Sequence, residues 1–280
     1  MSSWSEVLKT YFNFFPTERE KYYLFINDPL VEKFDLHSWK SWFTRSFKRD
    51  KSELVIYDET SDSFRTKGLY LTRDKDDNFS KLEDFKPLAL TPNGDRRALF
   101  LDRDGVINVD KGYVSSTKDL VFVDGIEKLI KFCNEMKILV IVLTNQSGVG
   151  RGYYAEEDVY HLHQYMDEAL NKKGAKIDAW YFSPYHPESK IPKYKKVSLT
   201  RKPGPGMILN AAYKYNIDLE RSLMIGDKTS DILSHVDVYT ILLKGNYETG
   251  THKPVVENHK ESFEYLDDFF NSPLSMEKVN

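Results

Sequence analysis

The chain has 280 residues, a formal net charge of −3 and one cysteine, Cys133. Hydrophobic residues make up 40% of it and charged residues 30%, which is the balance of a globular protein and not of a disordered one. A single cysteine excludes an internal disulfide and any zinc site built from several cysteines. The near-neutral charge argues against a nucleic-acid or membrane partner.

The N-terminus lacks the basic and apolar regions of a secretory signal, and no apolar run approaches the ~20 residues of a membrane span. We therefore expect a cytoplasmic protein with no membrane segment.

Residues 1–94 are predicted to form a separate, smaller α+β domain that is rich in aromatic residues. They hold 18 of the 39 Phe, Trp and Tyr residues, and a turn signal with Pro and Asn-Gly ends the segment. Strands are expected over 21–26, 54–57 and 68–71, and a helix over 38–47. No motif in this part indicates a role.

Residues 95–280 show short apolar runs that alternate with amphipathic segments. Strands are expected over 98–102, 138–143, 178–182, 223–226 and 238–243, and helices over 125–136, 156–171 and 206–215. This alternation predicts an α/β fold, a Rossmann-like open parallel sheet with helices on both faces. Ligands of such sheets bind at the carboxyl ends of the strands, so the polar residues that follow each strand are the candidates for function.

Two carboxylates, Asp102 and Asp104, stand two residues apart at the end of the first of these strands. Two such charges repel each other unless a cation lies between them or one carboxyl group holds a proton. Mg²⁺ prefers oxygen ligands of this kind. By itself, however, an Asp-x-Asp-Gly segment also occurs in turns and in calcium loops.

Three further segments follow strands or precede helices. Residues 144–152 (TNQSGVGRG) offer hydroxyl, amide and backbone donors for an oxyanion. Residues 201–207 begin with two cations, and a later strand ends at Asp227 with Asp231 four residues on. Each segment also has a plain structural interpretation: a glycine-rich turn, a solvated basic pair, and an acid in the first turn of a helix. Together at one sheet edge they compose a site for phosphoryl transfer.

This order of motifs resembles the haloacid dehalogenase (HAD) superfamily of phosphatases. The segments most similar to it are FLDRDGVINVDKGYV, LTNQSGVGRGYY, RKPGPGM and MIGDKTSDI. They resemble the D-glycero-D-manno-heptose-1,7-bisphosphate 7-phosphatase branch, with the histidinol-phosphate phosphatases as near relatives. The resemblance spans roughly residues 96–245 and implies a capless HAD fold, because only one loop and one helix fit between Gly105 and Thr144.

The resemblance also implies roles for the acidic residues. Asp102 would be the nucleophile that forms an aspartyl-phosphate, and Asp104 would be the general acid and base. Mg²⁺ would be bound by Asp102, by the backbone carbonyl of Asp104 and by Asp227. Asp231 would lie behind the metal or the catalytic lysine.

The same resemblance assigns the phosphoryl group and the rest of the substrate. Thr144 and Lys202 would hold the transferring phosphoryl group. The residues expected to face the remainder of the substrate are Asn145, Gln146, Arg151 and Arg201.

The sequence departs from this branch in two ways. The relatives carry a zinc loop with a Cys-Pro-x-His segment and a Cys-x-Cys segment, where this chain has Ser183 to Pro187 and Ser198 to Thr200. We therefore expect no zinc, with His186 as an ordinary loop residue. The second departure is the extra segment 1–94, which could cover the site, bind a partner or build an oligomer.

The leading interpretation is a Mg²⁺-dependent phosphatase that acts on a small sugar phosphate, a heptose bisphosphate, in nucleotide-heptose and surface-polysaccharide biosynthesis. The alternatives are a histidinol-phosphate phosphatase and a polynucleotide 3′-phosphatase, whose phosphatase domain has similar Thr-Asn-Gln and Arg-Lys-Pro segments. Against the polynucleotide alternative, the first 94 residues have no basic excess to attract a phosphate backbone. A further alternative is a scaffold that retains the fold without activity. The oligomeric state is left open.

Overall fold

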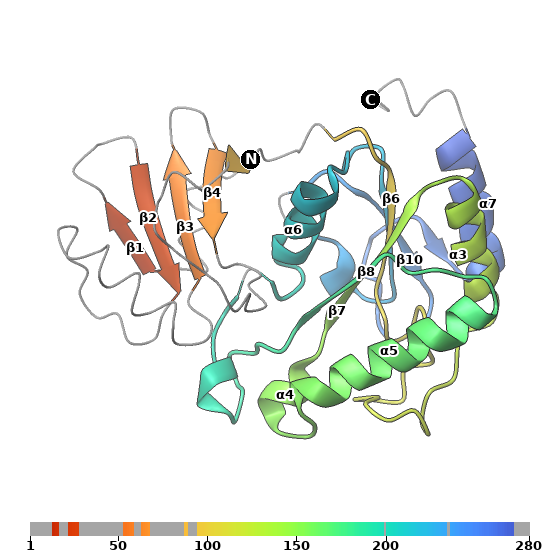
Figure 1. Cartoon of the computed structure of the whole chain (residues 1–280), viewed down its shortest axis with the longest axis horizontal. Coiled ribbons are helices and arrows are strands. Elements are labelled where there is room, and N and C mark those ends of the chain that lie inside the picture. Colours follow the sequence, from red (N-terminus) through yellow and green to blue (C-terminus); the bar gives the residue numbers. More distant parts are fainter. Residues whose placement is uncertain are drawn as a thin grey trace. The chain divides into compact units, whose positions relative to one another are not determined.

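The computed structural model describes residues 94–271, except 199, 234 and 235, together with five strands that precede residue 90. The chain separates into two compact units (Figure 1). One comprises Met1–Leu90 with Val197–Leu199, and the other comprises Thr91–Lys196 with Thr200–Asn280. The division between the units lies close to the predicted boundary at residue 94.

The described strands of the first unit form an antiparallel sheet in chain order. They are β1 (Asn13–Pro16), β2 (Tyr22–Asn27), β3 (Glu53–Asp58), β4 (Ser63–Lys67) and β5 (Pro87–Leu88). The strands expected over 21–26 and 54–57 are thus confirmed within one residue. The expected helix over 38–47 and strand over 68–71 lie outside the described residues.

The second unit is built on a parallel sheet with the strand order β11-β10-β9-β6-β7-β8. Its strands are β6 (Ala98–Leu101), β7 (Leu139–Asn145), β8 (Ala179–Ser183), β9 (Leu223–Gly226), β10 (Tyr239–Leu243) and β11 (Val255–Val256). The predicted open parallel sheet is confirmed. The short edge strand β11 had no counterpart among the expected elements.

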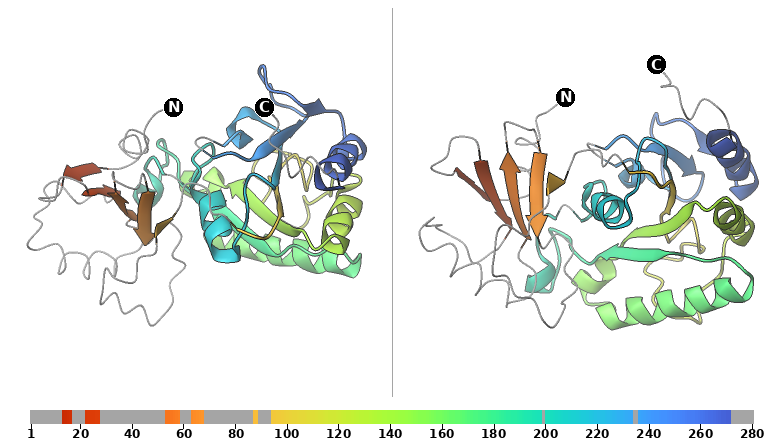
Figure 2. Two further views of the ribbon diagram at one scale, coloured as in Figure 1. Left: turned by 90° about the horizontal axis from the view of Figure 1, so that it is seen from above. Right: turned by 45° about the horizontal axis from the view of Figure 1, so that its top comes forward.

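Helices cover both faces of this sheet (Figures 1 and 2). The helices α3 (Ile126–Glu135), α5 (Glu156–Lys172) and α7 (His259–Asn271) pack on one face, where their apolar residues share a core with alternate residues of the strands. On the other face lies α6 (Gly206–Tyr215), most of whose described side chains are buried. Between these elements are α4 (Ser147–Arg151) and the short 3₁₀ helices η2 (Pro192–Tyr194) and η3 (Thr229–Asp231).

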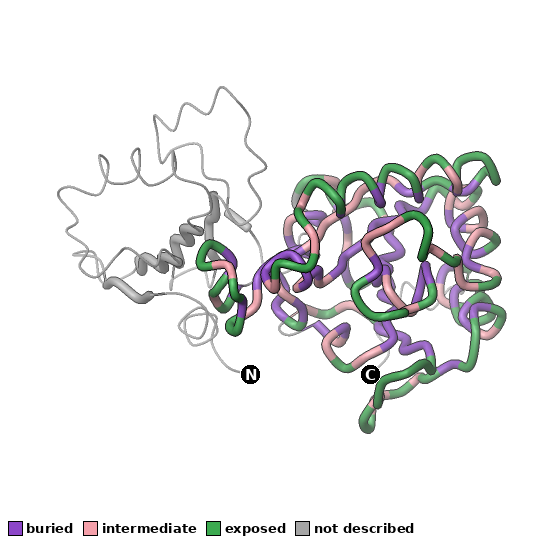
Figure 3. The backbone as a smooth tube through the Cα atoms, turned by 90° about the horizontal axis from the view of Figure 1, so that it is seen from below, coloured by how far each residue is buried: buried purple, intermediate pink, exposed green. Residues whose placement is uncertain are grey.

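The sequence explains how α3 packs. Ile126, Leu129, Ile130 and Cys133 recur at helical spacing and are buried against the sheet. Burial raises the pKa of the Cys133 thiol to about 12, so this cysteine is an unreactive core residue. The central strands β6, β7 and β9 are buried in the interior of the unit, where buried residues are purple in Figure 3. None of the helices in the described part of the chain has the length and apolar character to cross a membrane.

The position of β6 determines where a site can form. It pairs with β7 on one side and with β9 on the other, and the chain winds outward from it in both directions. Such a reversal of strand order opens a crevice at the carboxyl ends of the neighbouring strands. The residues that follow β6, β7 and β9 therefore meet at one edge.

Candidate active site

Asp102 lies at the centre of this edge, directly after β6. Its backbone N–H continues the ladder to β9 by donating to the Ile225 carbonyl at 2.9 Å. Its buried carboxylate accepts a hydrogen bond from Lys202 Nζ at 2.7 Å, and Lys228 Nζ lies 3.7 Å from its other oxygen. Burial alone would raise the pKa of Asp102, but the two ammonium groups hold it below its usual range. Asp102 is therefore a charged carboxylate that is almost completely buried.

Asp104 is held by donors from two loops. Both its oxygens accept from the guanidinium of Arg103, at 2.8 to 3.2 Å. Asn108 Nδ2 donates to one oxygen at 3.0 Å and Gln146 Nε2 to the other at 2.9 Å. The side chain of Asp104 is 14% exposed, so it is accessible to solvent although these hydrogen bonds fix its orientation.

Arg103, the residue between the two aspartates in the sequence, is fully buried, and sequence reasoning gave it no role. Its guanidinium also donates to the Val114 carbonyl at 2.7 Å and contacts His163 Nε2 at 3.5 Å. His163 in turn stacks on Trp180. Burial and the adjacent Arg103 lower the pKa of His163 well below its usual value, so the imidazole is neutral and can accept. Arg103 therefore serves to orient Asp104.

The turn after Asp104 depends on a glycine. Gly105 has φ +89°, and its N–H donates to the Asn108 carbonyl at 2.7 Å. A Cβ at this position would lie 2.0 Å from Asp227 Oδ2 and 3.1 Å from Asp227 Cβ. The absence of a side chain thus lets the loop after β6 approach the loop after β9.

We expect Gly105→Ala to lower both stability and activity. The left-handed backbone costs about 1–3 kcal/mol for a residue with a Cβ, and the methyl group displaces the Asp227 carboxylate. Urea unfolding and phosphate release would measure the two effects. The control is Gly174→Ala, which has φ +76° but meets only the Lys131 side-chain carbon Cε at 3.4 Å. Equal activity in the two variants would contradict a specific role for the close approach.

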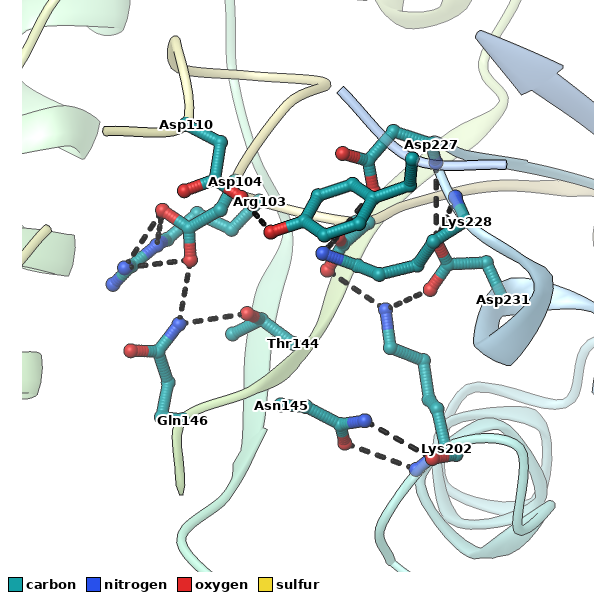
Figure 4. Close-up of polar contacts among 12 residues, drawn as sticks. Arg103, Asp104, Asp110, Thr144, Asn145, Gln146, Lys202, Asp227, Lys228 and Asp231 are labelled. Atoms are coloured by element: carbon teal, nitrogen blue, oxygen red, sulfur yellow. Dashed lines mark hydrogen bonds and ion pairs between the residues drawn. The ribbon is translucent and has the colours of Figure 1, made fainter. Parts of the chain in front are cut away.

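Three consecutive residues at the end of β7 connect the parts of the site (Figure 4). Thr144 is buried, and its hydroxyl accepts from Gln146 Nε2 at 2.9 Å. The Asn145 side chain makes two bonds to the main chain of Lys202, one from Nδ2 to the carbonyl and one to Oδ1 from the N–H. Gln146 also accepts from the Tyr154 hydroxyl at 2.7 Å. Both amides are thus engaged inside the protein, where they position Lys202 and Asp104.

Lys202 is completely buried between two carboxylates. Its ammonium lies 2.7 Å from Asp102 Oδ1 and 2.5 Å from Asp231 Oδ1. Burial would lower the pKa of Lys202, but the two carboxylates outweigh it and raise this pKa. The second oxygen of Asp231 accepts the backbone N–H groups of Asp227 and Lys228 at 3.0 and 3.2 Å. Because both of its oxygens are committed, Asp231 orients Lys202 and the loop after β9.

Asp227 is held less closely than Asp231, whose Oδ1 lies 2.5 Å from the Lys202 ammonium. Asp227 Oδ1 is buried and makes no hydrogen bond among the described residues, although Lys228 Nζ lies 3.2 Å away as an ion pair. Burial and the neighbouring Asp102 raise the pKa of Asp227 to about 7. Carboxylate oxygens of Asp102, Asp227 and Asp231 all lie within 4.8 Å of one another. This donor set fits a divalent cation that prefers oxygen ligands, with Asp102 and Asp227 as its carboxylate ligands.

Arg151 and Arg201 form a second, cationic part of the site. Arg201 donates to the Tyr185 carbonyl at 3.2 Å, and its pKa is lowered by burial and then by the charge of Arg151. Arg151 Nε is buried without a hydrogen-bond partner in the described part of the chain. The same two guanidinium groups, after burial, lower the pKa of His186. A cluster of cations with an unsatisfied donor indicates an anion-binding region.

Two residues near the acidic cluster went unnoticed in the sequence. Lys228 directly follows Asp227, and its ammonium lies over the ring of Tyr247 at 4.5 Å from the centroid. Tyr247 belongs to the loop after β10, for which no motif exists. The position of Lys228 next to a strand-ending aspartate was a usable signal, whereas nothing in the sequence indicated Tyr247.

Comparison with known proteins agrees with this geometry. A HAD-hydrolase-like family model matches residues 199–267. A D-glycero-α-D-manno-heptose-1,7-bisphosphate 7-phosphatase of Burkholderia mallei is 52% identical over 136 residues, which cover 49% of this chain and 72% of that protein. The chain belongs to the HAD-like phosphatases of the heptose-bisphosphate phosphatase family. It is a phosphatase, as the sequence predicted.

Other relatives extend the match. A D-glycero-β-D-manno-heptose-1,7-bisphosphate 7-phosphatase of Pasteurella multocida is 37% identical over 174 residues, covering 61% of this phosphatase and 91% of the relative. A crystal structure of a HAD-like phosphatase from Mesorhizobium loti is 31% identical with a TM-score of 0.57, covering 62% of this chain and 86% of that one. The D,D-heptose 1,7-bisphosphate phosphatase of B. bronchiseptica, crystallised with magnesium and phosphate, is 27% identical with a TM-score of 0.51. The match covers 61% of this chain and 97% of the B. bronchiseptica chain.

Proposed function

We propose that this phosphatase hydrolyses the 7-phosphate of a D-glycero-D-manno-heptose 1,7-bisphosphate with the help of Mg²⁺. The observation that carries the proposal is the buried Asp102 carboxylate, which lies between Lys202 and Lys228 and next to the unsatisfied Asp227 oxygen. The relatives of this chain are named as phosphatases of that substrate. A small-molecule biosynthetic role of this kind suits the expected cytoplasmic location, and nucleotide-heptose synthesis for surface polysaccharide is the pathway we propose.

In the proposed first step, an Asp102 oxygen attacks the phosphorus and the bond from phosphorus to the sugar oxygen breaks. Asp104 supplies the proton that the leaving oxygen takes up. In the second step Asp104 removes a proton from water, whose oxygen attacks the same phosphorus and releases Asp102 and inorganic phosphate. Thr144 and Lys202 would bind the phosphoryl oxygens during both steps, and Lys202 would offset their charge.

Mg²⁺ would be held by the carboxylates of Asp102 and Asp227 and by the backbone carbonyl of Asp104. The bound ion would offset the charge of the phosphoryl oxygens as they approach Asp102. A metal ion suits the local charges: within the described residues, the carboxyl groups of Asp102, Asp227 and Asp231 form ion pairs with two ammonium groups, those of Lys202 and Lys228. A further positive charge is therefore required before a phosphate dianion can bind.

The second phosphate of the substrate would lie against Arg151 and Arg201. We expect Arg201→Ala to raise KM for a bisphosphate by roughly 10- to 100-fold, the cost of one charged hydrogen-bond partner, and to change kcat much less. A monophosphate lacks the second anion, so its KM should hardly respond. Steady-state kinetics on both substrates measure the difference, with the exposed Lys172→Ala on α5 as control. An equal rise for both substrates would contradict the assignment.

We also propose that the loop after β8 is held without zinc. The Ser183 and Thr200 hydroxyl groups, at positions where the relatives' motif has cysteines, form a buried hydrogen bond to each other of 3.0 Å. His186 Nδ1 accepts the Glu188 N–H at 3.1 Å, and the nearby guanidinium groups disfavour a cation. An apolar cluster supports the loop: Val149, Val159, Tyr185 and Tyr194.

This account predicts that a zinc-selective chelator leaves the melting temperature unchanged and that the isolated protein contains no stoichiometric zinc by elemental analysis. Ser183→Ala should lower the free energy of unfolding by about 0.5–1.5 kcal/mol, since one buried hydrogen bond is lost. A double-mutant cycle with Thr200→Val should return a coupling energy for the pair. One zinc ion per chain, or melting lowered by the chelator, would contradict the proposal.

The experiment that tests the proposed function is phosphate release with Mg²⁺ across a substrate panel. The panel contains heptose 1,7-bisphosphates of both anomers, other sugar bisphosphates, histidinol phosphate and a 3′-phosphorylated oligonucleotide, with Asp102→Asn as the blank. Preference for a heptose bisphosphate supports the proposal. Preference for the oligonucleotide, together with binding that weakens steeply with salt, would overturn the substrate class.

A further inference from the structure

The ammonium of Lys228 lies beside the two carboxylates that would hold a divalent cation. It lies 3.2 Å from Asp227 Oδ1 and 3.7 Å from Asp102 Oδ2. The other Asp102 oxygen is engaged by Lys202. Lys228 and a metal ion therefore compete for the same two oxygens, and the outcome depends on what else holds the lysine side chain. The ammonium of a lysine carries one positive charge at neutral pH, so Lys228 competes as a cation.

Tyr247 contacts the Lys228 ammonium through the face of its ring. Lys228 Nζ lies 4.5 Å from the centre of the Tyr247 ring, within the range of a cation–π contact. The Tyr247 hydroxyl donates to Asp110 Oδ2 at 2.8 Å, and Asp110 Oδ1 accepts the Gly112 N–H at 2.8 Å. The tyrosine thus connects the loop after β10 with the loops after β6 and β9. Figure 4 shows Asp110 and Lys228 among the side chains of this pocket.

Burial does not account for the position of Tyr247, which is 44% exposed. Two directional contacts fix it instead: the phenol bond to Asp110 and the ring contact to Lys228. The phenol bond determines where the ring stands, and the ring attracts the ammonium toward the rim of the site. A bound metal ion would leave the contact between the Lys228 ammonium and the Tyr247 ring in place, because the ion binds the carboxylate oxygens and not the ring.

We propose that Tyr247 is a positioning residue that draws the Lys228 ammonium toward the rim of the site and so leaves the Asp102 and Asp227 oxygens accessible to a divalent cation. This positioning role rests on the proposed function. It means that the loop after β10 helps to determine the affinity of the site for the metal. It requires no direct contact between Tyr247 and the substrate. Without the ring, the ammonium would spend more of its time between the two carboxylates and compete more strongly with the metal.

The first test is calorimetric titration of the free protein with MgCl₂ alone. Tyr247→Leu should weaken Mg²⁺ binding by about three-fold, the size of an exposed cation–π contact. Tyr247→Phe keeps the ring but loses the phenol bond to Asp110 that places it, so its Mg²⁺ affinity should lie between that of Tyr247→Leu and that of the unchanged protein. The matched control is Tyr239→Leu, which is also 44% exposed but stacks on Phe269, away from Lys228. Unchanged Mg²⁺ affinity in Tyr247→Leu, or weaker Mg²⁺ binding in Tyr247→Phe than in Tyr247→Leu, would overturn the proposal.

A double-mutant cycle separates positioning from general loop damage. Lys228→Met removes the competing ammonium and should tighten Mg²⁺ binding. In that background, Tyr247→Leu should no longer change Mg²⁺ affinity, because the ring has no cation left to hold. A loop that simply became disordered would weaken binding in both backgrounds and overturn the assignment. Melting temperatures of all variants verify that they are folded.

The metal titration also keeps this inference separate from the proposed function, since it uses no substrate. If the substrate panel shows no phosphatase activity while the cycle behaves as described, the positioning role stands and the proposed function fails. If the panel succeeds and the cycle shows no coupling, the proposed function stands and Tyr247 has no positioning role. With a preferred substrate, Tyr247→Leu should require more Mg²⁺ for half-maximal rate and reach a similar kcat at saturating Mg²⁺.

Discussion

Asp102→Asn should reduce phosphate release by at least about 10⁴-fold, the scale on which removal of a catalytic nucleophile is measured. The amide has nearly the same shape as the carboxylate, and its oxygen can still accept the hydrogen bond from Lys202. Lys202 also keeps its ion pair with Asp231, so neither of these two buried charges loses its partner. We therefore expect a folded variant whose melting temperature stays within a few degrees of the unchanged protein.

Two measurements check this expectation. Steady-state assays give the loss of activity, and mass spectrometry of acid-quenched samples looks for phosphate on Asp102 during turnover. The unchanged protein should carry the modification and the variant should not. Substantial residual turnover in Asp102→Asn would mean that another group attacks the phosphorus.

Lys202→Met should damage both stability and catalysis. The methionine fills the volume of the lysine stem but leaves two buried carboxylates, Asp102 and Asp231, without the ammonium between them. Breaking a buried ion pair from one side costs about 3–5 kcal/mol. Loss of the positive charge beside the phosphoryl oxygens should lower kcat by roughly 10²- to 10³-fold. Urea unfolding followed by circular dichroism, and kinetics on the folded fraction, measure the two losses.

A second substitution separates these effects. Adding Asp231→Asn to Lys202→Met removes one of the two stranded charges and should recover much of the stability, while the activity stays low. The control is Lys244→Met, which breaks an exposed ion pair with Glu257 and should change neither quantity measurably. Recovery of activity in the double variant would show that Lys202 matters only for folding.

The sequence was sufficient to predict the framework because the strands of the parallel sheet, apart from the short edge strand β11, have a strong local pattern. Ala98 to Leu101 and Leu223 to Gly226 are continuous apolar runs that are each followed by an aspartate, so the strands and the acidic residues at their ends could be predicted together. The helix α7 was not among the expected elements, because two of the four residues on its buried face, His259 and Ser262, are polar and weaken the apolar pattern of a helix.

Side-chain direction was the part that residue types could not determine. Asn145 and Gln146 looked like substrate donors because amides bind oxyanions, but an amide bonds equally well to a main chain or to a carboxylate. In the structure they bond to Lys202 and to Asp104. Their expected contact with the substrate stays a prediction. Tyr247 was beyond prediction for a related reason, since its partners Asp110 and Lys228 come from distant loops.

The central place of β6 has a consequence for how the protein is made. This strand ends beside Asp102, the proposed nucleophile, and its two neighbours, β7 and β9, are synthesised at very different times. When β7 emerges from the ribosome it can cover one edge of β6, but the other edge stays open until Leu223 to Gly226 have been translated. During that interval the nascent chain presents an unpaired apolar strand edge, which is a template for wrong pairing. The phosphatase site is consequently among the last parts of the chain to assemble.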